Sequence, residues 1–362
     1  MKYLTFKNKN YEIYNIDCMD SKRGLESIPD NSIDFIITDP PYFIDGMDSK
    51  WDKNKLDSKV AKSGVIGSLP VGMKFDKSQS VKLQEFMTPI CKQFFRILKP
   101  GAFCVIFSQA RLYHAMATSA DIAGFEIRDM LVWKYSGQAK AFSLNHFIDK
   151  DKNLNKQEKA KLKQELKGLK TPQLRPQIEP MVLAQKPRVG TFLENYQRYK
   201  VGLMDATQSL DSKFPSNFIS ADCLESKNHA KDSKNIEKTK AATLNKAKNP
   251  KDLHVDSIES TLPQNDHPTD IESKMQGDID LDSINPIFEH PKPKNKVHLT
   301  QKPVELISHL IKLFTRENQI VLDPFLGSGS HAIAALESNR KIIGFELNPE
   351  YFAIARRRIE SI

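Results

Sequence analysis

Four consecutive residues, Asp39-Pro40-Pro41-Tyr42, place an acid, two prolines and an aromatic ring in a row. They follow a mostly apolar run, residues 32–38, that predicts a buried strand. In an open α/β sheet, ligands bind outside the carboxyl ends of such strands. There the Asp39 carboxylate can accept hydrogen bonds from an amino group, the prolines fix the direction of neighbouring carbonyls, and Tyr42 offers a flat face for stacking. The stretch therefore predicts a site for a planar ring that carries an exocyclic amine.

The chemistry of such an amine explains why these groups would be needed. The amine of adenine or cytosine is a poor nucleophile, because its lone pair is delocalised into the ring. Two acceptors that hold its hydrogens would draw the nitrogen towards tetrahedral geometry and localise the lone pair. The competing interpretation is an ordinary turn, with Tyr42 used for packing. The remainder of the chain favours the site, because it supplies a second ligand-binding pattern.

The second pattern is a glycine-containing stretch that joins a predicted strand, residues 319–322, to a helix. It reads Asp323-Pro324-Phe325-Leu326-Gly327-Ser328-Gly329-Ser330. Glycines in such a turn let a ligand approach the backbone closely. Glu346 ends the next predicted strand, and an acid about 20 residues past such a turn usually binds ribose hydroxyls. The pattern predicts a nucleoside cofactor, and the lack of a GxxxxGK[ST] sequence disfavours a phosphate-cradling site.

The elements that must position these residues alternate between apolar strand runs and helical periods. Strands are predicted at 11–16, 32–38, 102–107, 130–135, 178–185, 319–322 and 341–345. Helices are predicted at 21–28, 81–98, 112–123, 149–170, 304–314, after Ser330 and near Arg356, with Lys99-Pro100-Gly101 ending the second. This alternation predicts an α/β fold with a doubly wound, mainly parallel sheet. Pro180 predicts that 178–185 is an edge strand.

Two polar segments interrupt this alternation. Residues 43–80 predict a loop beside the Asp39 site, of the kind that forms lids or binding loops. Residues 222–294 lack a sustained apolar period, so they are expected to pack poorly and to form an insertion in the α/β pattern.

Composition sets limits on the partners and on the compartment. The formal charge of +9 and the pI of about 9.1 favour an acidic polymer as partner, although a solvated lysine-rich surface gives the same charge. The four cysteines are scattered without a Cys-x-x-Cys pair, so neither a metal site nor a disulfide framework is expected. The sequence shows no signal-peptide core and no apolar run of membrane-spanning length, so we expect a cytoplasmic protein without membrane contact.

Together the two patterns resemble the beta group of S-adenosylmethionine-dependent DNA methyltransferases, which methylate adenine N6 or cytosine N4. In that family an acid-Pro-Pro-aromatic stretch forms the catalytic pocket, and an Asp-Pro-Phe-x-Gly-x-Gly stretch binds the cofactor. Here the catalytic stretch comes first, which is the circularly permuted order of the beta group. Residues 298–303 resemble the segment before the family's cofactor strand, with Leu299 where proline is common. The resemblance covers about 11–220 and 296–360, and it implies a Rossmann-like methyltransferase fold with an inserted target-recognition region.

The resemblance implies a role for each matching position. Asp39 and the Pro40 carbonyl would hold the amine, Tyr42 would stack on the base, and Pro41 completes the catalytic stretch. The implied cofactor-binding positions are Asp17, Cys18, Asp39, Thr300, Lys302, Asp323, Phe325, Gly327, Ser328, Gly329, Glu346 and Asn348. Asp17 and Cys18 would lie near the adenine of the cofactor, Glu346 on its ribose, and Thr300 and Lys302 where the pocket closes. For Asp17 the alternative is a helix N-cap, and for Cys18 it is core packing.

The implied activity is methylation of a base that is flipped out of double-stranded DNA. Asp39 favours adenine N6, because the cytosine enzymes of the family more often carry serine there. Cytosine N4 methylation, an RNA methyltransferase and a non-catalytic DNA-binding protein are the alternatives. A cognate restriction endonuclease of a restriction-modification system and a homodimer are left open as further partners.

These implications divide the chain into three parts. Residues 1–136 form the catalytic half of the methyltransferase domain, and 295–362 form the cofactor-binding half. Residues 137–294 hold the edge strand, the target-recognition region and the insertion.

Overall fold

The computed structural model describes residues 5–41, 78–135, 141–172, 174–210, 214–220 and 302–362. Tyr42 and Thr300 lie outside this part of the chain, as do the predicted insertion at 222–294 and nearly all of the predicted loop at 43–80. All described residues belong to one unit, formed by residues 1–227 and 296–362. The division at 136 and 294 therefore stays a prediction.

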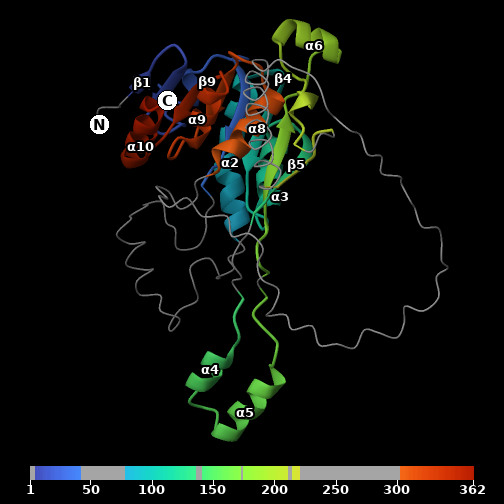
Figure 1. The fold of residues 1–362 in the computed structure, drawn as a ribbon, viewed down its shortest axis with the longest axis vertical. Helices are drawn as coiled ribbons and strands as arrows, with labels where there is room; N and C mark the ends of the chain where they lie inside the picture. Colours follow the sequence, from blue (N-terminus) through green and yellow to red (C-terminus); the bar gives the residue numbers. More distant parts are fainter. Residues whose placement is uncertain (1–4, 42–77, 136–140, 173, 211–213, 221–301) are drawn as a thin grey trace, which may run out of the picture. The chain divides into compact units, whose positions relative to one another are not determined.

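Nine strands of the described residues form one sheet, in the order β1-β2-β9-β8-β3-β4-β6-β5-β7 (Figure 1). Their bounds are β1 Thr5–Lys7, β2 Tyr11–Tyr14, β3 Ile33–Thr38, β4 Leu98–Phe107, β5 Glu126–Lys134, β6 Ile178–Gln185, β7 Phe218–Ser220, β8 Ile320–Asp323 and β9 Lys341–Phe345. Neighbouring strands from β2 to β4 are parallel, whereas β6 is antiparallel to both β4 and β5. The predicted mainly parallel α/β fold is confirmed.

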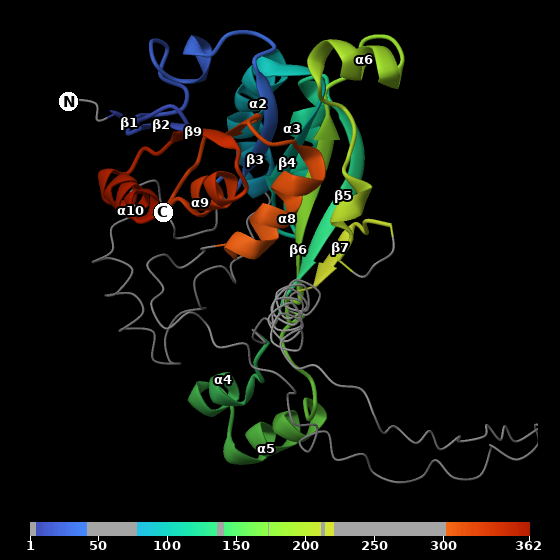
Figure 2. The same cartoon turned by 45° about the horizontal axis from the view of Figure 1, so that its top comes forward.

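Helices cover both faces of the sheet (Figures 1 and 2). Their bounds are α2 Ser78–Ile97, α3 Tyr113–Ile122, α4 Asn145–Lys150, α5 Lys156–Glu165, α6 Phe192–Tyr199, α8 Val304–Phe314, α9 Ser330–Glu337 and α10 Pro349–Glu360. The central strand β3 is buried at every position. Its Phe35 and Ile37 pack in a core with α8, α9 and α10, and Ile36, between them, packs in a second core with α2 and α3. Side chains that point to opposite faces of one strand thus explain the two helical layers.

Strand β6 is an interior strand, so the prediction of an edge strand from Pro180 is wrong. The Pro180 carbonyl accepts a hydrogen bond from the Ser108 amide, at 2.9 Å, one residue beyond the end of β4. The N–H and C=O of a strand residue point to the same side, so the N–H that proline lacks falls where the β4 ladder ends. An interior strand can therefore carry Pro180 at this position.

Two helix predictions need correction. Residues 21–28 form a turn and a short 3₁₀ helix, η1 Leu25–Ser27, because Gly24 in the middle of the stretch has an extended backbone, with φ −80° and ψ −152°, that interrupts the helix. The long helix α2 passes directly into β4 at Leu98, so Lys99-Pro100-Gly101 belongs to the strand.

The predicted helix 149–170 is a pair of helices, α4 and α5, between β5 and β6. Asn155 interrupts it, because its side chain and that of Glu158 form a capping box that starts α5. None of the α5 side chains is buried, and both helices stand apart from the sheet (Figure 2). Within the described residues, no helix has the length and apolar character needed to cross a membrane.

Candidate active site

The sheet order brings the two sequence patterns together at the carboxyl ends of the parallel strands, the edge of the sheet meant below, although they lie far apart in the chain. Strands β3 and β8 are parallel neighbours, with Phe35 opposite Val321 and Ile36 opposite Leu322. Their carboxyl ends therefore meet, and the Thr38 hydroxyl donates a hydrogen bond to the Asp323 carboxylate at 2.8 Å. Asp39 and the buried Pro40 follow Thr38 directly. The Asp39 stretch and the glycine-containing turn are thus two walls of the same site.

The Asp323 carboxylate is fully buried and is used by the chain itself. Besides Thr38, it accepts a hydrogen bond from the Phe325 amide at 3.0 Å and pairs with His331 Nδ1 at 2.6 Å. His331 lies in the first turn of α9, and its Nε2 has no hydrogen-bond partner among the described residues. Asp323 therefore holds the turn against β3 and α9 and leaves the ligand-facing part to the following residues.

The two glycines of the turn serve different purposes. Gly327 and Gly329 both have positive φ, +54° and +85°, which L-residues rarely adopt. A Cβ on Gly329 would lie 3.0 Å from Ala355 of α10, whereas among the described residues a Cβ on Gly327 would meet nothing closer than the Phe325 carbonyl oxygen at 4.0 Å. Gly329 is needed for helix packing, and Gly327 borders open space where a ligand can approach.

Three further predicted positions mainly support the turn. The backbone carbonyl and hydroxyl of Ser328 both bind Arg358 of α10, at 2.6 and 3.1 Å. The Phe325 ring packs against Phe86 of α2, with 6.0 Å between ring centroids. The Asn348 side chain caps α10 by accepting hydrogen bonds from the Glu350 and Tyr351 amides.

Glu346 lies at the end of β9, and its carboxylate faces the turn. One oxygen accepts a hydrogen bond from the Gly327 amide and the other from the Asn348 amide, each at 2.7 Å. Burial raises the pKa of Glu346 to about 7, although the two amides lower it. A carboxylate oxygen has room for more than one donor, so Glu346 can also accept hydrogen bonds from hydroxyl groups of a ligand beside Gly327.

Asp17 and Cys18 lie just beyond β2, the strand next to β9. Asp17 is exposed, and its carboxylate accepts a hydrogen bond from the Met19 amide at 2.9 Å, so it caps a turn and not the helix expected there. Cys18 is buried, and burial raises the pKa of its thiol to about 12. Cys18 is therefore a neutral core residue at this edge.

A buried lysine connects the Asp39 stretch to β6. Lys302 Nζ lies 2.8 Å from Asp39 Oδ2 and 2.7 Å from Glu179 Oε1, and Lys302 is 7% exposed. Burial alone would lower the pKa of the Lys302 ammonium, but the Asp39 and Glu179 carboxylates more than offset it and raise the pKa. The Phe107 ring lies 5.1 Å from the ammonium. Lys302 is thus a cation held between two carboxylates against an aromatic wall.

Sequence reasoning did not find Thr38, Glu179 or His331. Glu179 carries a signal, because it is an acid at the start of an otherwise apolar strand run. His331 also carries one, since it follows the glycine turn at the start of a helix. The pairing of Glu179 with Lys302 depends on strand order, which local patterns do not encode. No cluster of three His, Cys, Asp or Glu residues that could hold a metal ion is present in the described part of the chain.

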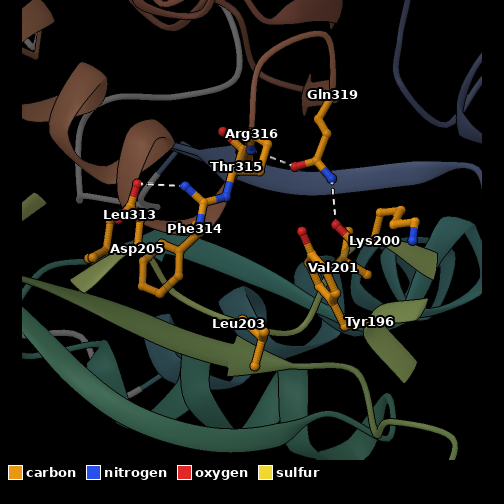
Figure 3. A pocket seen from close by; sticks show the side chains of 10 residues that line it. All are labelled: Tyr196, Lys200, Val201, Leu203, Asp205, Leu313, Phe314, Thr315, Arg316 and Gln319. Atoms are coloured by element: carbon orange, nitrogen blue, oxygen red, sulfur yellow. Dashed lines mark hydrogen bonds and ion pairs between the residues drawn. The ribbon is translucent and has the colours of Figure 1, made fainter. Parts of the chain in front are cut away.

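The described residues also line a pocket of about 240 Å³ at the opposite edge of the sheet, where the parallel strand β8 begins (Figure 3). Gln319, which precedes β8, borders it, whereas the Asp323 site follows β8. Its polar groups bind one another: Arg316 pairs with Asp205 at 2.8 Å, and Gln319 donates to the Lys200 carbonyl at 2.7 Å. This pocket is separate from the site where the two sequence patterns meet.

The structure is thus an α/β protein in which two stretches that follow neighbouring parallel strands meet at the carboxyl ends of those strands. Comparison with known proteins gives the class. The N6/N4 methyltransferase family model, described as "DNA methylase", matches residues 33–357. The chain therefore belongs to this family of DNA methylases, whose members transfer methyl groups from S-adenosylmethionine to exocyclic amines of DNA bases. The resemblance found in the sequence is confirmed at this level.

Individual relatives are more distant or match over shorter stretches. Type II methyltransferase M.HindIII of Haemophilus influenzae is 26% identical over 363 residues, which cover 95% of each chain. The putative methylase YubD of Escherichia coli is 47% identical over 68 residues, 19% of this chain and 30% of that protein. Among solved structures, the PvuII DNA methyltransferase (cytosine-N4-specific) gives a TM-score of 0.48 at 16% identity, covering 97% of this chain and 87% of the other.

Proposed function

We propose that this protein transfers the methyl group of S-adenosylmethionine to the N6 amine of adenine in double-stranded DNA. The observation that supports this most directly is the position of Asp39. Its carboxylate follows β3 at the carboxyl ends of the strands, where the glycine turn follows the neighbouring strand β8, and its Oδ2 lies 2.8 Å from Lys302 Nζ. An amine between these two walls would lie beside both an acceptor and the methyl donor, and alignment of this kind lowers the barrier to transfer.

The residues of the second wall fit the cofactor. Gly327 borders open space, and Glu346 presents a partly buried carboxylate beside it. S-adenosylmethionine, when bound, supplies a methyl group on a sulfonium. In the proposal, Glu346 accepts hydrogen bonds from the ribose hydroxyls, Gly327 allows close approach, and Asp17 and Cys18 lie near the adenine. Thr300 and Tyr42, whose roles rest on the sequence alone, close the pocket and stack on the target base.

The Asp39 wall then does the catalytic work on the base. Asp39 and the Pro40 carbonyl accept the two amine hydrogens and orient the nitrogen lone pair towards the methyl carbon. Because positive charge moves onto the amine as the new bond forms, the carboxylate binds the transition state more strongly than the ground state. No general acid is required, since the leaving thioether is neutral.

The α4–α5 hairpin supports DNA as the substrate. Strand β5 runs parallel to β4, because both are antiparallel to β6, so the hairpin leaves the sheet at the same edge as Asp39. Its exposed lysines include Lys156, Lys161 and Lys167. Cations at this edge can neutralise phosphates on either side of the flipped base.

Nucleoside analysis tests the proposal and its alternative. The protein is incubated with S-adenosylmethionine that carries a labelled methyl group and, in separate reactions, with duplex DNA and with RNA, and the digested nucleosides are separated by mass spectrometry. We expect labelled N6-methyladenine. Labelled N4-methylcytosine would show that cytosine is the target base and would leave the proposed mechanism unchanged. Label in RNA alone would refute a DNA substrate. A role as the modification enzyme of a restriction-modification system follows from the type II relatives, and the homodimer and the cognate endonuclease stay predictions.

A further inference from the structure

A side-chain hydrogen bond joins the two walls of the candidate active site. The backbone pairing of β3 with β8 ends at Ile36 and Leu322, two residues before Thr38. Beyond that point the Thr38 hydroxyl donates to the Asp323 carboxylate, with 2.8 Å between Thr38 Oγ1 and Asp323 Oδ1. Both side chains are fully buried. The bond therefore ties the end of β8 to the residue that directly precedes Asp39.

The Asp323 carboxylate is also connected to the glycine turn and to α9, by contacts that do not involve Thr38. The oxygen that binds Thr38 accepts a second hydrogen bond from the Phe325 amide at 3.0 Å, and the other oxygen pairs with His331 Nδ1 at 2.6 Å. Loss of the Thr38 hydroxyl would leave both of these contacts in place. It would therefore keep the glycine turn and release the end of β3 from it.

The separation of the two walls matters for methyl transfer. In the proposed function Asp39 holds the amine and the glycine turn holds the cofactor, so the position of β3 relative to the turn sets the distance between the reacting atoms. The amine nitrogen forms a bond to the methyl carbon while the carbon–sulfur bond breaks and its electron pair stays on sulfur. The methylated amine then releases one proton to water. A misplacement of about 1 Å can slow such a step about 10²-fold.

We propose that Thr38 is a positioning residue for methyl transfer, whose hydrogen bond to Asp323 fixes Asp39 relative to the glycine turn. The inference rests on the proposed function, because it takes Asp39 as the residue that holds the amine. Thr38 itself is fully buried and its hydroxyl is bound to Asp323, so it touches neither reactant and transfers no proton. Its effect is confined to the rate of the methyl-transfer step.

The test is Thr38→Val, which removes the hydroxyl and keeps the shape of the side chain. The methylation rate is measured in a single turnover with saturating S-adenosylmethionine and duplex DNA, and the two dissociation constants are measured separately by calorimetry and fluorescence anisotropy. We expect the rate to fall roughly tenfold or more, and both dissociation constants to change less than about twofold. Thr38→Ser keeps the hydroxyl and should keep most of the rate. Thr38→Cys offers a weaker donor, so its rate should lie between those of the other two variants.

Thr315→Val is the matched control, because it removes a buried hydroxyl at the opposite edge of the sheet. The Thr315 hydroxyl donates to the Ile311 carbonyl and accepts a hydrogen bond from Arg340 Nε, and Thr315 borders the pocket of Figure 3. This variant should keep the full methylation rate, even if its melting temperature falls as far as that of Thr38→Val.

Three outcomes would overturn the inference in favour of a merely structural threonine. They are an unchanged rate in Thr38→Val, a rate in Thr38→Ser as low as in Thr38→Val, and a loss of cofactor or DNA binding that accounts for the slower rate. If Thr38→Val did not fold, a normal rate in Thr38→Cys would overturn it equally. Failure of the proposed function is distinguishable, because the unsubstituted protein would then yield no methylated nucleoside.

Discussion

The Gly327 amide and the Glu346 carboxylate form a hydrogen bond of 2.7 Å across the mouth of the glycine turn. It ties the end of β9 to the turn that follows β8, so the proposed ribose acceptor is fixed before a ligand arrives. It also limits the cost of burying the carboxylate, which would otherwise be protonated still more readily.

The first prediction concerns the pH dependence of cofactor affinity. Burial raises the pKa of Glu346 from 4.5 to about 7. The folded protein therefore holds this proton more tightly than the unfolded chain does, and the stability that the protonated form contributes is lost as pH rises through about 7. Ribose hydroxyls donate to the ionised carboxylate, so affinity should move in the opposite direction. We expect S-adenosylmethionine to bind more weakly below about pH 7, by at most about tenfold per pH unit.

Calorimetric titrations between pH 5.5 and pH 8 would measure this dependence, since about 1.4 kcal/mol corresponds to a tenfold change. Glu346→Gln cannot titrate and serves as the control, which should bind weakly at every pH. Glu346→Ala should also bind weakly, losing a few kcal/mol at most, on the order of two hydrogen bonds to a charged group. If the cofactor affinity of the unsubstituted protein did not change with pH, and Glu346→Ala bound the cofactor with normal affinity, Glu346 would not be part of the cofactor site.

A second prediction separates backbone strain from ligand contact at Gly327. Gly327→Ala should weaken cofactor binding by roughly tenfold or more, because the methyl group enters the open space beside Glu346. Gly168→Ala is the matched control: Gly168 also has positive φ, +84°, and its added Cβ meets nothing within 4 Å. Both variants should lose about 1–2 kcal/mol of stability from strain. Equal cofactor affinities in the two would show that Gly327 borders no ligand.

Parts of this site follow from sequence and others do not, for identifiable physical reasons. Asp39, Asp323 and Glu346 could be placed at strand ends because an apolar run that stops at an acid is a local signal. That Asp39 and Asp323 lie side by side depends on the pairing of β3 with β8, which is a long-range property that local patterns do not encode. Pro180 favours an edge strand by its sequence alone, but its missing N–H falls at the end of the β4 ladder, which only the register reveals. The helix predicted at 21–28 is interrupted at Gly24, whose backbone is extended.

A third prediction addresses the buried pair of Asp323 and His331. His331→Ala should destabilise the fold by about 1–3 kcal/mol, because it removes one partner of a carboxylate that is fully buried. His331→Asn keeps a donor near the same place and should lose less. Urea unfolding followed by circular dichroism would measure both. If His331→Ala were as stable as the unsubstituted protein, the turn would not depend on this contact.

A fourth prediction concerns the hairpin lysines and DNA. Replacing the exposed Lys156, Lys167 and Lys170 by glutamine should weaken DNA binding and make it less sensitive to salt. The slope of log K against log salt concentration is negative, and each lost phosphate contact makes it less negative by about 0.9. Fluorescence anisotropy between 50 and 200 mM salt gives the slope. Over this range the DNA affinity of a protein with several phosphate contacts commonly falls about 10³-fold or more.

The control for the hairpin is a triple substitution at the opposite sheet edge. Lys7, Lys9 and Lys200 are exposed there, and their replacement by glutamine changes the net charge by the same amount. If the control reduced the salt slope as much as the hairpin variant, overall charge would explain binding and the hairpin would have no special part.

The last prediction concerns Asp39 and decides the proposed mechanism. Asp39→Ala should reduce turnover by roughly 10²-fold or more, as removal of one transition-state acceptor commonly does, while the dissociation constants for S-adenosylmethionine and DNA stay nearly unchanged. Asp39→Ser should be less damaging, because a hydroxyl still accepts a hydrogen bond from the amine. Lys302 loses one of its two carboxylate partners in both variants, so thermal melting must show that each still folds. A folded Asp39→Ala protein that methylates DNA at the normal rate would refute the role of the carboxylate, whichever base carries the methyl group.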